Sequence, residues 1–292
     1  MKSDYVFFEG HYVPALTSVT LQTRPRETVP AIELSPEVGE FLTAAMAPRS
    51  LPASNYRARA LARRIPACLR LLGAATPAQG LQQLRQKPEL VDSVVGTVLL
   101  GVTEFFRDAA VFEHLRFSVL PWLLAHDQRL RVWSAACSEG QELYSIALLL
   151  AEDGRLHDCE LVGTDCRREA IHVARAGVFD AESVAVLDSH WRRNFFTISS
   201  VHATIASALV RATKWKVANL FEGVERGPWH LILWRNMAIY LEHFAAEELW
   251  WALCRELLSG GYLITGKADH PPAGLPLKRI APCIYQKVDS RS

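Results

Sequence analysis

The 292-residue sequence has almost no excess of charge of either sign and no long hydrophobic run. It contains 32 Lys and Arg against 31 Asp and Glu, a net charge of +1, which gives no argument for a nucleic acid or a membrane surface as partner. No segment approaches the ~18 consecutive apolar residues that cross a bilayer, and the acidic residues near the amino terminus are unlike a secretory signal. We therefore expect a cytoplasmic, monomeric globular protein, with neither nucleic-acid binding nor membrane insertion.

The sequence also lacks the cysteine and histidine spacings of metal sites and disulfide frameworks. No two of its six cysteines form a C-x-x-C pair, and its ten histidines show no ligand spacing. We therefore expect free thiols, as in a reducing compartment, and no bound metal.

The chain divides into three regions with different sequence patterns. Residues 1–34 form an N-terminal extension in which two short apolar segments flank Glu9-Gly10, a pattern that predicts either a hairpin or a mobile arm. Residues 35–124 have helical periodicity, and repeated prolines limit the length of each helix, so we expect a small α-helical domain. These prolines are Pro48, Pro52, Pro66, Pro77 and Pro88.

In the third region, residues 125–292, short apolar strands alternate with helices. The strand segments are RLRVWSAA, ELVGTD, KWKVANL, WHLILW and GYLITG. This alternation predicts an α/β fold with a parallel sheet covered by helices on both faces. The last segment, LKRIAPCIYQKV, predicts an antiparallel hairpin at the sheet edge. Residues 189–217 contain more β-branched residues than one crossover helix requires, and we expect a small β insertion there.

The stretch WSAACSEGQEL, which begins at Trp133, joins the first strand to a helix that we expect to start at about Ser138. Ser138 and Gln141 have the spacing of a capping box, and the small residues around Gly140 leave room for a ligand against the main chain. Asp165 ends the second strand, where an acid accepts hydrogen bonds from a ribose. The pattern therefore favours a nucleoside, and the missing second and third glycines of G-x-G-x-x-G disfavour a dinucleotide. A turn and a capped helix with no ligand remain the alternative.

Seven segments, in this order and spacing, resemble the CheR family of bacterial chemotaxis receptor methyltransferases. They are TEFFRD at 103–108, RVWSAACSEGQELYSIA at 131–147, GTD at 163–165, ARAGVF at 174–179, VANLFE at 217–222, LILWRNMAIYL at 231–241 and LLSGGYLITG at 257–266. The resemblance implies a Rossmann-like class I methyltransferase domain that uses S-adenosylmethionine (SAM) to methylate receptor glutamates. It also implies a helical amino-terminal domain that recognises the substrate and a small β subdomain.

The resemblance also implies roles for individual residues. Arg235 and Tyr240 would be catalytic, with Tyr240 facing the methyl group and the incoming substrate. Cofactor contacts would come from Thr103, Arg107, Gly140, Gln141, Asp165, Asn219, Leu220, Arg235 and Asn236. Asp165 would bind the ribose hydroxyls, Asn219 and Leu220 would lie at the adenine, and Arg107 would lie near the cofactor carboxylate.

Several positions depart from the family pattern. The usual Asn before the T-x-F-F-R segment is Gly101, the usual Glu after the motif glycine is Gln141, and the usual Asp at the start of a central strand is His230. The pattern D-I-D is replaced by Asp165-Cys166-Arg167. These departures leave open a catalytically weak or inactive protein that binds SAM or its demethylated product, S-adenosylhomocysteine (SAH), and acts through a partner.

A basic segment in the helical region suggests the kind of partner. Arg57, Arg59, Arg63, Arg64 and Arg70 would make one helix face basic, which favours an acidic helical surface such as a chemoreceptor-like bundle. The resemblance places Arg57, Arg63 and Arg64 at the substrate. A solvated basic face, or a small carboxylic acid as acceptor, are the alternatives. The segment TISSVHATIAS lacks the glycine turn expected in the β insertion, so we do not infer that it binds a receptor tail.

Overall fold

The computed structural model describes residues 5–8, 11–14, 34–99, 101–127 and 129–289. The chain forms two compact units, residues 1–32 and 33–292. In the first unit, strands β1 (Tyr5–Phe8) and β2 (His11–Pro14) pair antiparallel. This pairing agrees with the hairpin, one of the two alternatives that the sequence left open, and the connecting Glu9-Gly10 lies outside the described residues.

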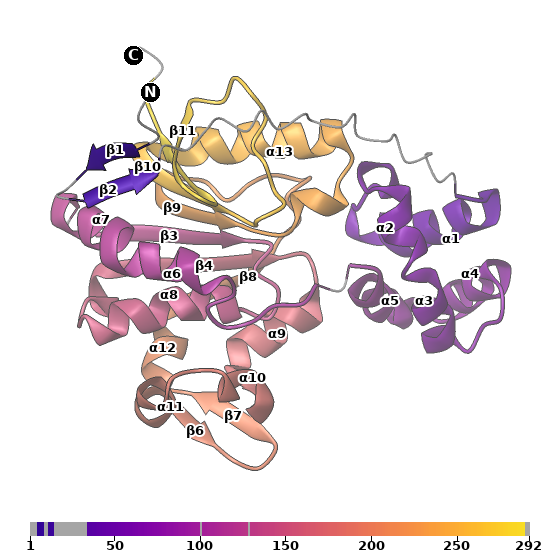
Figure 1. The fold of residues 1–292 in the computed structure, drawn as a ribbon. Helices are drawn as coiled ribbons and strands as arrows, with labels where there is room; N and C mark the ends of the chain where they lie inside the picture. The colour runs from indigo at the N-terminus through magenta and orange to yellow at the C-terminus, as the bar shows by residue number, and fades with distance from the viewer. Residues whose placement is uncertain (1–4, 9–10, 15–33, 100, 128, 290–292) are drawn as a thin grey trace. The chain divides into compact units, whose positions relative to one another are not determined.

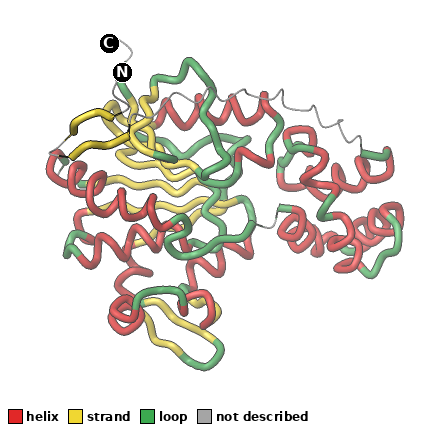
Figure 2. Tube along the Cα trace, viewed as in Figure 1, coloured by secondary structure: helices red, strands yellow, loops and turns green. Residues whose placement is uncertain are grey.

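The second unit is built on a seven-stranded sheet (Figures 1 and 2). The strands lie in the order β11-β12-β10-β9-β3-β4-β8, and those from β10 to β8 are parallel. Their bounds are β3 Leu130–Ala135, β4 Cys159–Asp165, β8 Thr213–Val217, β9 Trp229–Trp234, β10 Leu257–Thr265, β11 Leu277–Ala281 and β12 Ile284–Lys287. The α/β fold class and the antiparallel hairpin at the edge are confirmed.

Strand β3 marks the point where the order of the sheet reverses. From β3 the chain adds β4 and β8 on one side, and it then returns to place β9 and β10 on the other. In open α/β sheets, ligands bind beyond the carboxyl ends of the strands at such a reversal. This topology directs the search for a site to the segments that follow β3, β4, β8 and β9.

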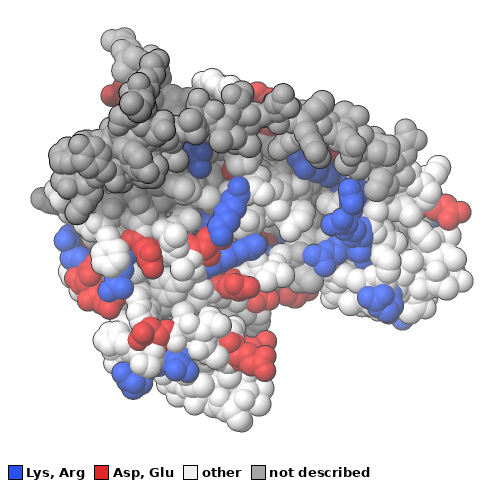
Figure 3. Space-filling view, viewed as in Figure 1, with Lys and Arg blue, Asp and Glu red and all other residues white. Residues whose placement is uncertain are grey.

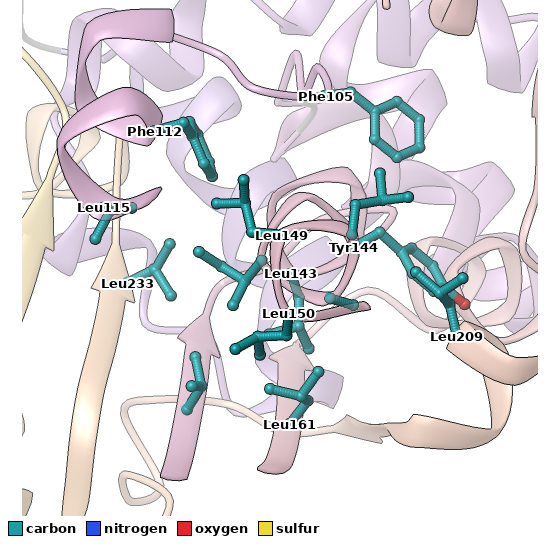
Figure 4. Packing of buried hydrophobic residues seen from close by; sticks show 14 of the residues in the cluster. Phe105, Phe112, Leu115, Leu143, Tyr144, Leu149, Leu150, Leu161, Leu209 and Leu233 are labelled. Carbon is teal, nitrogen blue, oxygen red and sulfur yellow. The ribbon is translucent and has the colours of Figure 1, made fainter. Parts of the chain in front are cut away.

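Helices cover both faces of the sheet. Successive residues of a strand point to opposite faces, so Leu130 and Val132 join the core around α8, whereas Trp133 and Ala135 join the core on the α13 side. Figure 4 shows side chains of α8 packed against Leu161 and Leu233 of the sheet. The covering helices are α6 Ala109–His114, α7 Leu120–His126, α8 Gln141–Glu152, α9 Arg168–Ala176 and α13 His243–Glu256.

Five short α-helices lie within residues 34–99, as the prolines predicted. They are α1 Pro36–Met46, α2 Ala58–Ala62, α3 Ile65–Leu72, α4 Pro77–Gln86 and α5 Val91–Val98. Pro36, Pro66 and Pro77 stand in the first turn of their helices, where the missing N–H is not needed. The predicted boundary at residue 124 separates elements that pack together, because α6, α7 and the π-helical turn Leu115–Val119 contribute to the core around α8.

A small three-stranded sheet lies apart from the main one (Figure 1). Its strands β5 (Val178–Asp180), β7 (His202–Ile205) and β6 (Phe196–Ile198) pair antiparallel. It therefore begins at Val178 rather than at Ser189, and β8 belongs to the main sheet. Its helices are α10 Ala181–Ala185, α11 Ser189–Phe195 and α12 Ser207–Ala212.

The turn between β3 and α8 differs from the prediction in two ways. Helix α8 begins at Gln141 with Gly140 as its N-cap residue at φ +92° and no side-chain cap, so the predicted capping box is wrong. The main-chain N–H of Ser138 donates to Asp165 instead, 2.8 Å away. The space beside Gly140 is filled by the indole of Trp215, because a Cβ on Gly140 would lie 2.6 Å from that ring. The absence of a side chain at Gly140 therefore makes room for the Trp215 ring.

This packing predicts the effect of one methyl group. A Cβ on Gly163 would lie 2.4 Å from the Trp215 ring, so Gly163→Ala should lower the free energy of unfolding by ~1–3 kcal/mol. Gly39 in α1 has no atom within 4 Å of its added Cβ, and Gly39→Ala should raise the free energy of unfolding by ~0.5–1 kcal/mol. Urea unfolding measures both, and a Gly163→Ala protein as stable as wild type would contradict the packing.

Candidate functional site

A cavity of about 220 Å³ lies beyond the carboxyl ends of the central strands. Its walls come from segments far apart in the sequence: the loop at 101–107, the turn at 136–142, residues 165–167 after β4, residues 218–221 after β8 and residues 235–240 after β9. Arg64, Leu99 and Leu249 complete the lining. The cavity thus occupies the place that the sheet topology indicates.

Arg235 connects several segments around this cavity. Its guanidinium is 2% exposed and lies 2.7 Å from Asp108 and 3.2 Å from Glu142, so it pairs with two carboxylates. Its Nε and Nη2 atoms also donate to the main-chain carbonyls of Thr265 (3.3 Å) and Arg107 (2.8 Å). The planar guanidinium thereby joins β9, β10, α8 and the loop at 101–108.

The carboxylates around Arg235 are themselves held by other groups. Glu142 accepts a hydrogen bond from the hydroxyl of Ser134 at 2.8 Å. Asp108 also pairs with Lys267 at 2.6 Å. Arg235 and Lys267 together balance the charges of the two carboxylates, and Glu142 still faces the cavity.

A second buried carboxylate, Asp269, shapes the segment after β9. It accepts hydrogen bonds from the main-chain N–H groups of Asn236, Ile239 (3.1 Å) and Gly266 (3.1 Å). Burial raises the pKa of Asp269, although these N–H groups oppose the rise. The contacts hold the turn that carries Asn236 and Tyr240 against the end of β10.

Hydrogen bonds and aromatic packing hold the loop at 101–108 over the start of α8. The N–H of Phe106 donates to the hydroxyl of Ser145 at 2.9 Å, and Arg107 donates to the carbonyl of Val102 at 2.7 Å. Phe105 packs edge-on against Phe179 and Phe196 of the small β subdomain. The loop therefore connects the small sheet to the cavity wall that contains Thr103 and Arg107.

Asp165 and Arg167 form a buried pair at the end of β4. Arg167 donates to Asp165 from Nε at 3.0 Å and from Nη2 at 3.2 Å, and its main-chain N–H donates at 2.9 Å. Burial lowers the pKa of Arg167, but the charge and hydrogen bonds of Asp165 raise it and prevail. Both side chains line the cavity.

The structure brings most of the predicted site residues to one cavity and leaves others outside it. Those that line it are Arg64, Thr103, Arg107, Asp165, Leu220, Arg235, Asn236 and Tyr240. Gly140, Gln141 and Asn219 are absent from the lining. The amide of Asn219 donates to the carbonyls of Arg49 (3.2 Å) and Ser50 (2.7 Å), and that of Gln141 donates to Glu139 at 3.3 Å. Glu142, one residue after the position where the family pattern has an acidic residue, lines the cavity.

Arg57 and Arg63 also lie outside the cavity lining. Arg57 holds the Tyr240 turn, because its N–H donates to the carbonyl of Tyr240 and its Nε to that of Leu241, both at 2.9 Å. Arg63 is exposed. The predicted single basic helix is two short helices, α2 and α3, which are separated at Arg63-Arg64. Figure 3 shows Lys and Arg side chains gathered over this helical region.

Two of the family departures are now placed. Gly101 lines the cavity. His230 lies at the start of β9, where its Nδ1 accepts the N–H of Arg131 at 3.0 Å and its Nε2 lies 3.3 Å from Asp127. His230 therefore has a structural role in the sheet and is not part of the cavity lining.

The lining residues fit the groups of SAM, the cofactor that the sequence suggests. Glu142 offers a carboxylate to a cationic group, Arg107 a cation to a carboxylate, and Leu220 with Phe221 an apolar wall to an adenine. The buried Oγ of Ser138 has no hydrogen-bond partner within the described residues, which is typical of an atom that binds a ligand. No group of three or more described His, Cys, Asp or Glu residues has a metal-binding arrangement.

The Asp108 pair predicts a pH-dependent contribution to stability. Burial raises the pKa of Asp108, but the Lys267 hydrogen bond and the charge of Arg235 lower it, and the net value is below the usual one. Its ionised form therefore stabilises the fold above the unfolded pKa of about 3.9, and the contribution is lost as pH falls through the folded pKa. Asp108→Asn should thus be less stable than wild type at pH 7.

The difference in free energy of unfolding between wild type and Asp108→Asn should shrink as pH falls below about 4, because wild-type Asp108 then becomes protonated. Urea unfolding at a series of pH values measures it. A difference that stays constant down to pH 3 would contradict the assigned ion pair.

Comparisons with known proteins identify the family. The model of the CheR methyltransferase SAM-binding domain matches residues 101–276. A probable chemotaxis protein methyltransferase of Rhizobium etli is 30% identical over 210 residues, covering 65% of this chain and 78% of the relative. Chemotaxis protein methyltransferases of Campylobacter jejuni and Pseudomonas aeruginosa are 29% and 28% identical, over 68% and 63% of this chain and 76% and 71% of theirs.

Within the described residues, no helix is both long and apolar enough to span a bilayer. The cavity lies inside the matched span except for Arg64 and Leu99. Because the family model covers more than half of the 292 residues, the chain belongs to the CheR methyltransferase family and contains its SAM-binding domain.

Proposed function

We propose that the protein is a protein-glutamate O-methyltransferase that acts on a chemoreceptor-like protein in the cytoplasm. The observation that carries this proposal is the cavity itself. It gathers Thr103, Arg107, Asp165, Arg235 and Tyr240 from three separate segments of the chain. In this proposal the loop at 101–107 and residues 165–167 and 218–221 hold the cofactor, and Tyr240 stands where the substrate enters.

The proposed reaction needs alignment more than acid or base catalysis. Bound SAM supplies a methyl group on a positively charged sulfur. A substrate glutamate, with an ordinary pKa of about 4.3, is already ionised at neutral pH. The protein then has to orient this carboxylate and exclude water from it. Tyr240 is 38% exposed and lines the cavity, so it stands at the opening with its hydroxyl available to the incoming carboxylate.

Arg235 acts in this proposal as a positioning residue rather than as a binder of the substrate carboxylate. Its guanidinium already binds two carboxylates and two carbonyls, which leaves one of five N–H groups. It holds Glu142 at the cavity wall and the main chain of Arg107 over it. This geometry supports a fixed cofactor site.

The helical region supports an acidic protein partner. Arg59, Arg63 and Arg70 are exposed on α2, α3 and their junction. Arg64 lies between this surface and the cavity, which it lines. We propose that an acidic helix of the receptor contacts these arginines and so presents its glutamate at Tyr240. The six free cysteines are consistent with a reducing cytoplasm.

Two observations favour a second function, a regulatory protein that binds SAM or SAH with little turnover. Asp165 is already bound by Arg167, and the usual acidic residue at position 141 is Gln141. Both features change how a cofactor is held. The turnover experiment below separates the two functions.

Turnover tests the proposal directly. The protein is incubated with methyl-labelled SAM and the membranes of its own cells, which contain the receptors, and base is then added. A glutamate methyl ester releases labelled methanol with base, so we expect volatile label that depends on the protein. Tyr240→Phe should lower kcat by ~10- to 100-fold with little change in SAH affinity, since it removes one positioned hydroxyl. Label that base does not release, or no label, would contradict the proposal.

The arginine surface predicts a separate effect. Arg63→Glu reverses one exposed charge outside the cavity lining, so the KM for the protein acceptor should rise by roughly 3- to 10-fold at low salt, whereas the Kd for SAH stays unchanged. Arg85→Glu, at an exposed position on α4, is the matched control. Equal effects of the two reversals on KM would argue against this docking surface.

A further inference from the structure

We propose that the ribose hydroxyls of the cofactor contact the guanidinium of Arg167, and that Asp165 acts on the ribose only through Arg167. This inference rests on the proposed cofactor site. The inference changes the chemistry expected at the ribose end of that site, where the resemblance implies a direct contact between the ribose and Asp165.

The carboxylate of Asp165 has no acceptor position left for a ribose. Its Oδ1 accepts from the main-chain N–H and the Nε of Arg167, at 2.9 and 3.0 Å. Its Oδ2 accepts from the N–H of Ser138 at 2.8 Å and from Nη2 of Arg167 at 3.2 Å. A carboxylate offers about four lone-pair positions, and these four donors occupy them.

The guanidinium of Arg167, in contrast, has donors to spare. It uses two N–H groups on Asp165, which leaves three of the five that a guanidinium carries. Arg167 lines the cavity. A ribose hydroxyl oxygen has two lone pairs and can accept hydrogen bonds from these N–H groups. The face offered to the ribose is therefore a donor face.

Arg167 is also held too firmly to withdraw when a ligand binds. Its side chain is 9% exposed, and its own main-chain N–H is tied to the same carboxylate. Moving the guanidinium out would leave a buried carboxylate without its cation, which is strongly unfavourable. The pair is thus a preformed part of the cavity wall.

The test compares SAH with its 2′-deoxy and 3′-deoxy analogues by calorimetric titration of the full-length protein. Wild type should bind one or both analogues about 10-fold or more weakly than SAH, since hydrogen bonds to charged groups are strong. Arg167→Ala should bind SAH about 10-fold more weakly than wild type and should bind the analogues as well as it binds SAH. The quantity compared is the ratio of the Kd for SAH to the Kd for the analogue within each protein. A structural change that weakens both ligands equally therefore cancels.

Two further variants keep the result interpretable. Arg167→Lys retains a cation beside Asp165, and its ratio of the Kd for SAH to the Kd for the analogue should lie between those of wild type and Arg167→Ala. Arg168→Ala removes the neighbouring arginine, whose side chain is 62% exposed and 3.8 Å from Asp92, and should keep the wild-type ratio. Far-UV circular dichroism verifies that each variant is folded.

The outcomes separate this inference from the proposed function. The opposite result is an Arg167→Ala protein that binds SAH more tightly than wild type and loses more affinity than wild type when a ribose hydroxyl is removed. That result would show that Asp165 binds the ribose directly and that Arg167 competes with the ribose for Asp165. An unchanged ratio in Arg167→Ala would also overturn the inference while leaving the cofactor site intact. Wild-type protein that does not bind SAH would overturn the proposed site and this inference together.

Discussion

The buried guanidinium of Arg235 is the contact on which the arrangement of the cavity depends. It binds Asp108, Glu142 and the carbonyls of Thr265 and Arg107 at once, so the ends of β9 and β10, the start of α8 and the loop at 101–108 are held in one geometry. In a buried site, opposite charges attract strongly but lose their hydration, and the pair is stable only when its hydrogen bonds are satisfied. Arg235 meets that condition through several partners in different directions.

The helical region is coupled to the same geometry through main-chain contacts. Tyr56 forms a β-bridge with Leu241, and Arg57 donates to the carbonyls of Tyr240 and Leu241. On the other side of the turn, Asp269 holds the N–H groups of Asn236 and Ile239. The turn with Tyr240 is therefore clamped between the helices and the sheet. In the proposed function, a receptor that contacts the helices would thereby come close to Tyr240, the residue that faces the receptor glutamate.

The sheet was predictable from the sequence because buried parallel strands are short continuous apolar runs, and RLRVWSAA and WHLILW have that pattern. The start of α8 at Gln141 was not predictable, because the N–H of Ser138 donates to Asp165 at the end of the neighbouring strand, a contact that local propensity does not contain. Arg167 was visible as a departure from the family pattern, but its pairing was not. Glu142 and Asp108 adjoin predicted residues, whereas Asp269 lies in a loop with no sequence signal. Only the fold brings Glu142 to the cavity, Asp108 to Arg235 and Asp269 to the turn after β9.

The central claim is that Arg235 builds the cofactor cavity through several hydrogen bonds at once, and calorimetric titration of SAH into wild type and Arg235→Lys tests it most directly. A lysine keeps the charge but cannot bind the same partners in their separate directions. The account predicts a folded Arg235→Lys protein, by circular dichroism, whose Kd for SAH is at least about 10-fold higher than that of wild type. An Arg235→Lys protein that binds SAH as tightly as wild type would contradict it.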